Sequence, residues 1–450
     1  MKRLFTNMGW LLGGRGINAV LSLVYLALAT RTLGLESFGY FAAIVALGQV
    51  VTGIANFQTW QFIVRWGANG DASGAAEQAV REVTGFAIAL DMVSVAVGIA
   101  LSALLVWSVP LWLPLPDDLL ALTFAYCIVS LLAIRSTPIG LLRVNFAYAT
   151  ATAAEAVQPI VRASGAVLAW LFMPTVTGFV LAYAAAEIAV AAALWIAAAR
   201  KERIDLGALS LRRIPARHRD AWRFVVSTNL SGSLTIAGKQ VLILLVGTFG
   251  GAALLGGFRV ASQLGQALVA LAQTVSKAIL PELVHARENA LVIARRMANI
   301  ALVGGVIAVL VALFFGRWGL EAIAGDEFRG FYWAMVILAI AGAVELVGAS
   351  LESLLVSAGR AHVSFVVRAI PTLLALVLLD TAIDWNGAKG AAFAVLGSSS
   401  LAVIGFYVAI INMQQIRIVV EPEGEGLDTG SEGGIEAMDE STGGPLPPRP

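Results

Sequence analysis

The stretch FGYFAAIVALGQVVTGIANFQTW, residues 38–60, is an apolar run of membrane length that carries a stripe of polar side chains. Its polar members fall three or four residues apart, which places them along one face of a helix. They are Gln49, Thr52, Asn56 and Thr59. Hydrocarbon offers such side chains no hydrogen-bond partners, so the stripe is expected to face a protein interior or a wet cavity.

A second stretch, LGGFRVASQLGQALVALAQTVSK at residues 255–277, has the same character. Its polar members at helical spacing are Arg259, Gln263, Gln266, Gln273 and Lys277. When Phe38-Gly39 is aligned with Leu255-Gly256, Gln49 falls on Gln266. The chain is therefore predicted to contain two related halves that share one polar cavity, an arrangement that favours transport across a membrane.

The composition is that of an integral membrane protein. Hydrophobic residues make up 59%, charged residues only 13%, and the mean hydropathy is +0.83, whereas soluble domains carry roughly 25% charged residues. We expect an all-α bundle of about twelve transmembrane helices, because the apolar runs have spanning length and are too long for barrel strands. The runs are 8–33, 38–63, 83–108, 118–141, 149–173, 176–199, 222–247, 252–280, 298–316, 331–355, 362–383 and 388–412.

The expected organisation is two six-helix lobes related by a pseudo-two-fold axis along the membrane normal. The N-terminal lobe covers 1–199, a basic cytoplasmic linker 200–221, the C-terminal lobe 222–415 and an acidic, disordered cytoplasmic tail 416–450. Most of the 30 Lys and Arg residues face the cytoplasm if both termini lie there. The linker's basic residues either bind anionic lipid head groups or serve only as a topology signal.

Four cations lie deep in the predicted spans, where an ionisable side chain is costly unless it has a function or a partner. They are Arg15, Arg162, Lys239 and Arg259. Arg15 is surrounded by Gly9, Gly13, Gly14 and Gly16, which let either a ligand or a neighbouring helix approach closely.

The acidic residues within spans are Asp91, Glu155, Glu187, Glu345 and Glu352. Of these, Asp91, Glu155, Glu345 and Glu352 are the candidates for ion coupling. Glu345 and Glu352 lie seven residues apart and share a helix face, which suits a titrating or cation-binding site. Structural ion pairs with nearby arginines are the alternative.

Other kinds of site lack sequence support. The three histidines fall in predicted loops, so no metal site is expected. No phosphate-binding loop is present, and we expect no cofactor, no catalytic residues and no nucleic-acid partner.

Short segments along residues 1–415 together resemble the polysaccharide transport family of the multidrug, oligosaccharidyl-lipid and polysaccharide exporter superfamily. These segments are Asn7 to Arg15, Arg31-Thr32-Leu33-Gly34, Phe38-Gly39-Tyr40, the loop around Arg143, Gly256-Gly257-Phe258-Arg259, Leu280-Pro281-Glu282 and Ala358-Gly359-Arg360. One position departs from the family. Relatives carry an acidic residue midway along the seventh helix, where this chain has Lys239-Gln240, so an ion-coupling site is not implied there.

The resemblance implies a flippase that moves an undecaprenyl-diphosphate-linked oligosaccharide across the bacterial inner membrane by alternating access, with both termini cytoplasmic. The diphosphate would bind the four deep cations, and the sugar would bind Gln49, Asn56, Gln263, Gln266 and Gln273. Expected partners are the lipid-linked oligosaccharide, the lipid bilayer, H+ or Na+ and polysaccharide assembly proteins. Two other functions stay open: an ion-coupled multidrug or small-molecule antiporter of the same fold, and a membrane polysaccharide polymerase or glycosyltransferase.

Overall fold

The computed structural model describes residues 2–67, 74–202, 204–217, 220–283, 290–357 and 360–420. At some helical positions, among them Arg15 and Gln273, only the backbone is described. Residues 421–450, most of the expected acidic tail, lie outside the described part. Within that part every regular element is a helix, as the sequence predicts.

The first group of helices, called the N half here, runs from α1 to α8. Its members are α1 (Lys2–Ala55), α2 (Thr59–Gly67), α3 (Gly74–Ser108), α4 (Leu120–Leu132), α5 (Ser136–Val144), α6 (Tyr148–Glu155), α7 (Val157–Phe172) and α8 (Val176–Ala199). The short α9 (Arg213–Arg217) follows in the linker. The C half comprises α10 (Ala221–Leu283), α11 (Ala290–Ala324), α12 (Tyr332–Ser357), α13 (Ala361–Val377) and α14 (Leu379–Val420), with the 3-10 helix η4 (Asp326–Phe331) before α12.

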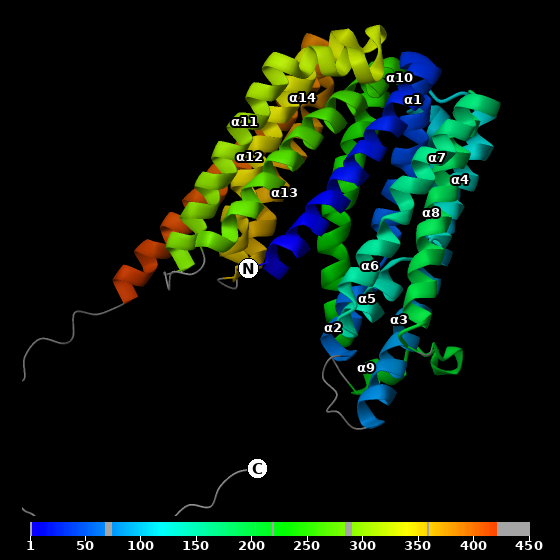
Figure 1. The fold of residues 1–450 in the computed structure, drawn as a ribbon, viewed down its shortest axis with the longest axis vertical. Helices are drawn as coiled ribbons and strands as arrows, with labels where there is room; N and C mark the ends of the chain where they lie inside the picture. The colour runs from blue at the N-terminus through cyan, green and yellow to red at the C-terminus, as the bar shows by residue number, and fades with distance from the viewer. Residues whose placement is uncertain are drawn as a thin grey trace, which may run out of the picture.

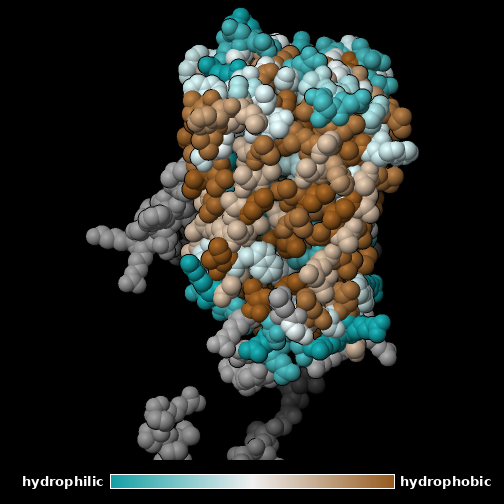
Figure 2. All heavy atoms as spheres, turned by 90° about the vertical axis from the view of Figure 1, so that its right-hand side faces the viewer, coloured by the Kyte–Doolittle hydropathy of each residue, from teal (hydrophilic) through white to brown (hydrophobic). Residues whose placement is uncertain are grey.

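The surface is that of a membrane protein. Eight helical segments of the described part are long and apolar enough to cross a bilayer, and His362–Val377 is a shorter apolar helix. Figure 2 shows an apolar band between polar ends. Large apolar side chains such as Leu104 (61% exposed) and Leu168 (56% exposed) lie on the outside. The all-α membrane class is therefore confirmed, while twelve separate spans in two symmetric lobes stay a prediction.

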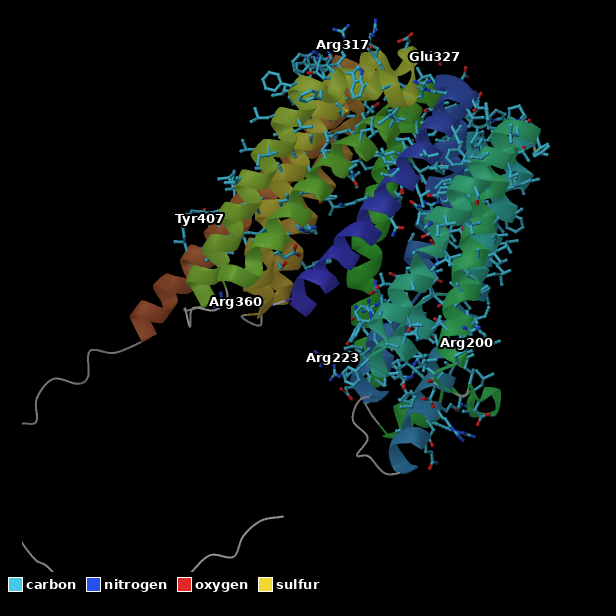
Figure 3. The ribbon with its side chains drawn as sticks, in the orientation of Figure 1. Arg200, Arg223, Arg317, Glu327, Arg360 and Tyr407 are labelled. Atoms are coloured by element: carbon cyan, nitrogen blue, oxygen red, sulfur yellow. The ribbon has the colours of Figure 1, made fainter. Side chains whose placement is uncertain are left out.

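The two halves form arms that meet at one end and diverge at the other (Figure 1). Helices α3, α4, α7 and α8 pack on α1, whereas α11, α12 and α14 pack on α10. The contacts between the halves run chiefly through α1 and α10, which pack against each other. Arg200, Arg223, Arg360 and Tyr407 lie toward the diverging ends, and Arg317 and Glu327 lie at the joined end (Figure 3).

Each of the central elements α1 and α10 consists of two helices that join at a glycine. Gly34 in α1 has φ 72° and ψ −179°, and Gly251 in α10 has φ 79° and ψ 174°. A positive φ is costly for residues with a Cβ and free for glycine. The alignment that superposes Gln49 on Gln266 also superposes these two glycines, so the kink occurs at the corresponding position of each predicted half.

Directly after the kinks, the two helices touch through a reciprocal glycine contact. A Cβ added to Gly39 would lie 1.9 Å from the carbonyl oxygen of Ala252, and one added to Gly256 would lie 2.5 Å from the carbonyl oxygen of Leu35. The repeat alignment relates Gly39 to Gly256 and Leu35 to Ala252. Each helix thus presents a glycine to the other's backbone, the small-residue packing that brings membrane helices close together. This contact is called the glycine crossing below.

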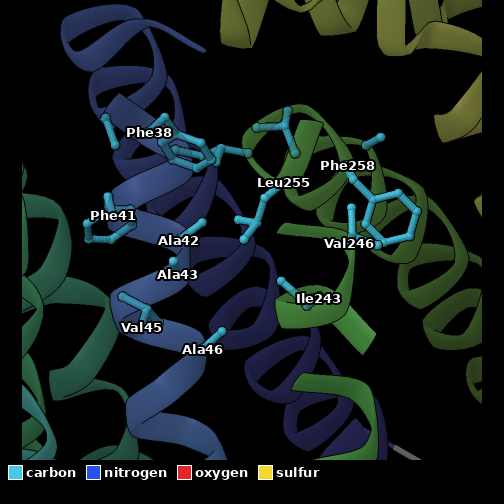
Figure 4. Close-up of a cluster of buried hydrophobic side chains, with 14 of the residues drawn as sticks. Phe38, Phe41, Ala42, Ala43, Val45, Ala46, Ile243, Val246, Leu255 and Phe258 are labelled. Atoms are coloured by element: carbon cyan, nitrogen blue, oxygen red, sulfur yellow. The ribbon is translucent and has the colours of Figure 1, made fainter. Parts of the chain in front are cut away.

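Apolar side chains fill the space around the glycine crossing. Figure 4 shows Phe38 on α1 and Leu255 and Phe258 on the adjacent part of α10, and these residues are at most 2% exposed. Phe38 also meets Phe328 of η4 edge to face, with ring centroids 6.1 Å apart. Dispersion across this close-packed seam holds the halves together, because lipid tails provide no hydrophobic drive between helices.

Polar contacts also join the halves at the end where they meet. The Arg31 guanidinium donates to the carbonyl oxygens of Ala322 (2.5 Å) and Ile323 (3.3 Å), which belong to the last turn of α11. A helix leaves these carbonyls without intrahelical donors, and a cation there also suits the helix dipole. In return, Glu327 of η4 accepts a hydrogen bond from the Leu35 amide at 2.9 Å, directly after the α1 kink.

The close approach at the glycine crossing makes Gly39 intolerant of any side chain. We expect Gly39→Ala to destabilise the protein by about 1–3 kcal/mol, because the added methyl must displace the α10 backbone. Gly397→Ala is the matched control, since a Cβ there meets no described heavy atom within 4 Å. Thermal unfolding of the detergent-solubilised variants measures the difference. Equal midpoints for the two variants would show that the helices do not pack this closely.

Candidate functional site

A polar cavity lies inside the N half, and we call it the N-half cavity. Its volume is about 540 Å3. Among its lining residues are Gln49, Thr52, Asn56, Gln58, Arg135 and Gln158. The polar stripe of α1 therefore faces a cavity, and amides from other elements join it.

Two helix breaks build this cavity. Residues 56–58 separate α1 from α2, and residues 133–135 separate α4 from α5. The breaks are joined by the Trp60 amide, which donates to Ser136 Oγ at 3.0 Å. Irregular backbone is tolerated at membrane depth only where it is buried in protein or lines a wet cavity. The N-half cavity therefore explains how the two helix breaks can lie within membrane-spanning segments.

Asp91 of α3 connects the two helix breaks through hydrogen bonds. Its carboxylate accepts hydrogen bonds from Thr137 (2.5 Å) and Thr59 (3.2 Å), which begin or nearly begin the helices α5 and α2. Asp91 is 4% exposed and is not among the residues that line the N-half cavity. In this conformation it positions the broken helices.

A cluster of ionic side chains forms one wall of the N-half cavity. Glu187 of α8 pairs with Arg135 and, at 3.5 Å between Oε1 and Nη2, with Arg162 of α7. Gln158 donates to the same Oε1 at 2.8 Å. Two guanidinium groups thus share the Glu187 carboxylate, and Glu155 at the end of α6 also attracts Arg135 electrostatically.

Arg162 is held in place by aromatic rings. Its guanidinium carbon lies 3.9 Å from the centroid of Tyr183 and 5.9 Å from that of Tyr25, close enough for cation–π attraction. Tyr25 and Tyr183 meet edge to face at 5.7 Å. Arg162 and Tyr183 also line the second cavity, so this residue pair lies where the two spaces adjoin.

The second cavity lies beside the glycine crossing, between α1, α10 and α12, and we call it the crossing cavity. Its volume is about 350 Å3. The charged residues among those that line it are Arg162, Lys239, Arg259 and Glu345. Lys239 Nζ lies 3.6 Å from the Glu345 carboxylate, and Arg259 donates to the Gln240 amide oxygen at 3.1 Å. Three cations against one carboxylate make this lining cationic.

The structure divides the sequence-predicted residues between the two cavities. Gln49 and Asn56 line the N-half cavity, and Gln263 and Gln266 line the crossing cavity. The stripes therefore face adjoining spaces connected at Arg162. The side chains of Gln273 and Arg15 lie outside the part of the structure that is described.

Like Asp91, the acidic candidates Glu155 and Glu352 are absent from both linings. Glu352 pairs with Arg368 at 2.6 Å and accepts from Ser364 at 3.0 Å. Glu155 ends α6 and is not a lining residue of either cavity. In this conformation Glu352 has the structural pairing that the sequence left as an alternative.

Arg135 and Gln158 line the N-half cavity but were not among the residues predicted from the sequence. Gln158 lies four residues before Arg162, so helical spacing could have placed both on one face. Arg135 lies within the apolar run 118–141, and no pattern marks the helix break that turns it toward Glu187. Glu187 was recognised as a deep acid but not as the partner of two arginines.

Comparison with known proteins identifies related chains and folds. A family model described as polysaccharide biosynthesis protein matches residues 4–286. The inner membrane protein YghQ of Escherichia coli strain K12 is 28% identical over 320 residues, which is 69% of this chain and 89% of that protein.

Solved structures with the same fold include two transporters. The lipid II flippase MurJ in an inward closed conformation gives a TM-score of 0.71 at 11% identity, covering 92% of this chain and 93% of that one. An inward-facing multidrug resistance transporter of the MATE family gives a TM-score of 0.66 at 14% identity, covering 89% and 96%. At these identities the likeness shows the fold.

The cavities predict which positions meet water. In a Cys127→Ala background, Gln49→Cys and Gln263→Cys should react rapidly with a small polar thiol reagent, because thiolate formation needs water. Val51→Cys is the control, since Val51 is fully buried in an apolar cluster. Mass spectrometry of the labelled protein measures the rates. If all three cysteines labelled equally slowly, both stripes would be dry packing faces.

Proposed function

Because the chain belongs to the polysaccharide biosynthesis protein family, we propose that it is a flippase for a lipid-linked oligosaccharide. The substrate is an oligosaccharide on undecaprenyl diphosphate, and it moves from the cytoplasmic to the outer leaflet of a bacterial inner membrane. The transporter fold shared with MurJ and the multidrug transporter supports transport over an enzymatic role.

The observation that carries the proposal is the juxtaposition of a cationic and an amide-rich cavity at Arg162. A diphosphate needs fixed cations with hydrogen-bond donors, which Arg162, Lys239 and Arg259 supply. A sugar needs many neutral donors and acceptors, and the amides of Gln49 and Asn56 belong to such a lining. The substrate joins the same two chemistries in one molecule.

A cationic crossing cavity also distinguishes this proposal from a multidrug antiporter. A site for cationic drugs needs an excess of acidic groups beside its aromatic ones. Aromatic rings do line the crossing cavity, but Glu345 is the only acid among its described lining residues and already contacts Lys239. The charge therefore favours an anionic substrate. If export is ion-coupled, Glu345 and the buried Asp91 are our candidates for binding H+ or Na+.

We assign the diverging ends to the cytoplasm, because basic residues such as Arg200, Arg223 and Arg360 gather there. Both cavities then receive substrate from the inside, and the undecaprenyl tail stays in the bilayer. Transport follows when the arms close at the cytoplasmic ends and separate at the joined end. Polysaccharide assembly proteins would accept the product on the outer face.

The direct test is translocation of a fluorescent lipid-linked oligosaccharide in vesicles that contain the purified protein. We expect Arg162→Ala to reduce the rate roughly tenfold or more, since it removes a charge-assisted contact with the diphosphate. Arg162→Lys should restore little, because an ammonium cannot bind the phosphate in a planar, bidentate manner. Arg317→Ala, an exposed residue at the joined end, is the control and should export normally. Wild-type vesicles that flip no faster than protein-free vesicles would refute the function.

A further inference from the structure

The ionic cluster at Glu187 has more donors than its acceptor can use. A guanidinium carries five N–H donors and a carboxylate has two oxygens. Both oxygens of Glu187 are already engaged, Oε2 by Arg135 and Oε1 by Gln158 and Arg162. In the described part of the chain, the buried Nε of Arg162 has no hydrogen-bond acceptor. The cluster therefore has more guanidinium donors than acceptor oxygens.

The unused donors lie at the walls of the two cavities. Arg135 and Glu187 line the N-half cavity, while Arg162 lines both cavities. The aromatic contacts with Tyr183 hold the Arg162 plane in position, so its donors are arranged in advance for an acceptor that enters from either space. Arg135 contacts the other oxygen of the Glu187 carboxylate. An anion with several oxygens could bridge both guanidinium groups.

Resting on the flippase function proposed above, we propose that Glu187 is an internal counter-ion that a phosphate group of the substrate displaces from Arg135 and Arg162. A phosphate group supplies more acceptor oxygens and more negative charge than a carboxylate. Displacement moves the Glu187 side chain and leaves Gln158 as its partner. Arg135 thereby becomes a further substrate-binding residue, and Glu187 a residue that sets affinity.

Exchange of the Glu187 carboxylate for the substrate phosphate would let the two arginines bind the substrate and still release it. Two unpaired arginines in a partly buried site would carry a large desolvation cost, which Glu187 offsets. When the substrate arrives, the guanidinium groups pass from one anion to another and are never left unpaired. When Glu187 returns, it competes with the phosphate for the same donors. The carboxylate is thus predicted to weaken binding in order to permit turnover.

Removing the counter-ion and removing a binding cation should have opposite effects. The experiment measures binding of geranylgeranyl diphosphate to the purified full-length protein in detergent. We expect Glu187→Gln to bind about fivefold tighter and Arg135→Ala about tenfold weaker than wild type. Asp220→Asn is the control, because it removes a carboxylate from the exposed Arg65 pair, far from this cluster, and should leave affinity unchanged.

A second variant and a melting curve separate binding from folding. Glu187→Asp keeps the charge on a shorter side chain that loosens the ion pair, so about twofold tighter binding is expected even if Glu187→Gln does not fold. A cluster with a structural role only would make both Glu187 variants bind more weakly, like Arg135→Ala. That result would overturn the inference while leaving the flippase function intact.

Three further ligands identify the chemistry. Inorganic pyrophosphate should respond to the substitutions in the same direction as geranylgeranyl diphosphate, and geranylgeraniol, which has no phosphate, should not respond. An equal response of phosphatidylglycerol would assign the site to ordinary lipid head groups and contradict the inference. If neither wild type nor any Glu187 variant bound a diphosphate, the inference would fail, and the translocation assay would still decide the proposed function separately.

Discussion

The architecture depends on the glycine crossing between α1 and α10. Gly39 meets the backbone of Ala252, and Gly256 meets that of Leu35, at distances that leave no room for a Cβ. Because the contacts between the halves run chiefly through these two helices, the crossing decides how the arms are held. Any rotation of one arm against the other must therefore pivot at this seam, where the two backbones come closest.

The cavities follow from what surrounds this crossing. Apolar residues seal the joined end, where Arg31 and Glu327 add polar contacts between the halves. Below the seal, the polar stripes of α1 and α10 face spaces that adjoin at Arg162. A cationic surface beside an amide-rich one is then available to a substrate that carries both a phosphate and a sugar. Rotation about the crossing would change which end of the molecule gives access to it.

Much of this could be predicted from the sequence because it is periodic. The spacing of Gln49 and Gln266 within apolar runs revealed both the repeat and the cavity-facing sides of two helices, and the same alignment relates the kinks at Gly34 and Gly251. The ionic cluster could not be predicted. The partner of Glu187 is chosen by a helix break before α5 and by the packing of α7 on α8, neither of which leaves a periodic signal.

If the halves rotate about the crossing, distances between spin labels at the two ends of the molecule must change in opposite senses. In a Cys127→Ala background, one pair of labels would be attached at Arg200 and Tyr407, toward the diverging ends. The other pair would be attached at the opposite end, at Arg317 and at the exposed Leu111, whose neighbour Leu113 lies beside Gly247 near the α10 kink. Pulsed electron paramagnetic resonance in vesicles would record both with and without a lipid-linked oligosaccharide. We expect that, while the protein transports substrate, the distance between the first pair of labels shortens as the distance between the second pair lengthens. Distances that change in the same sense, or a first distance that shortens while the second stays fixed, would contradict it.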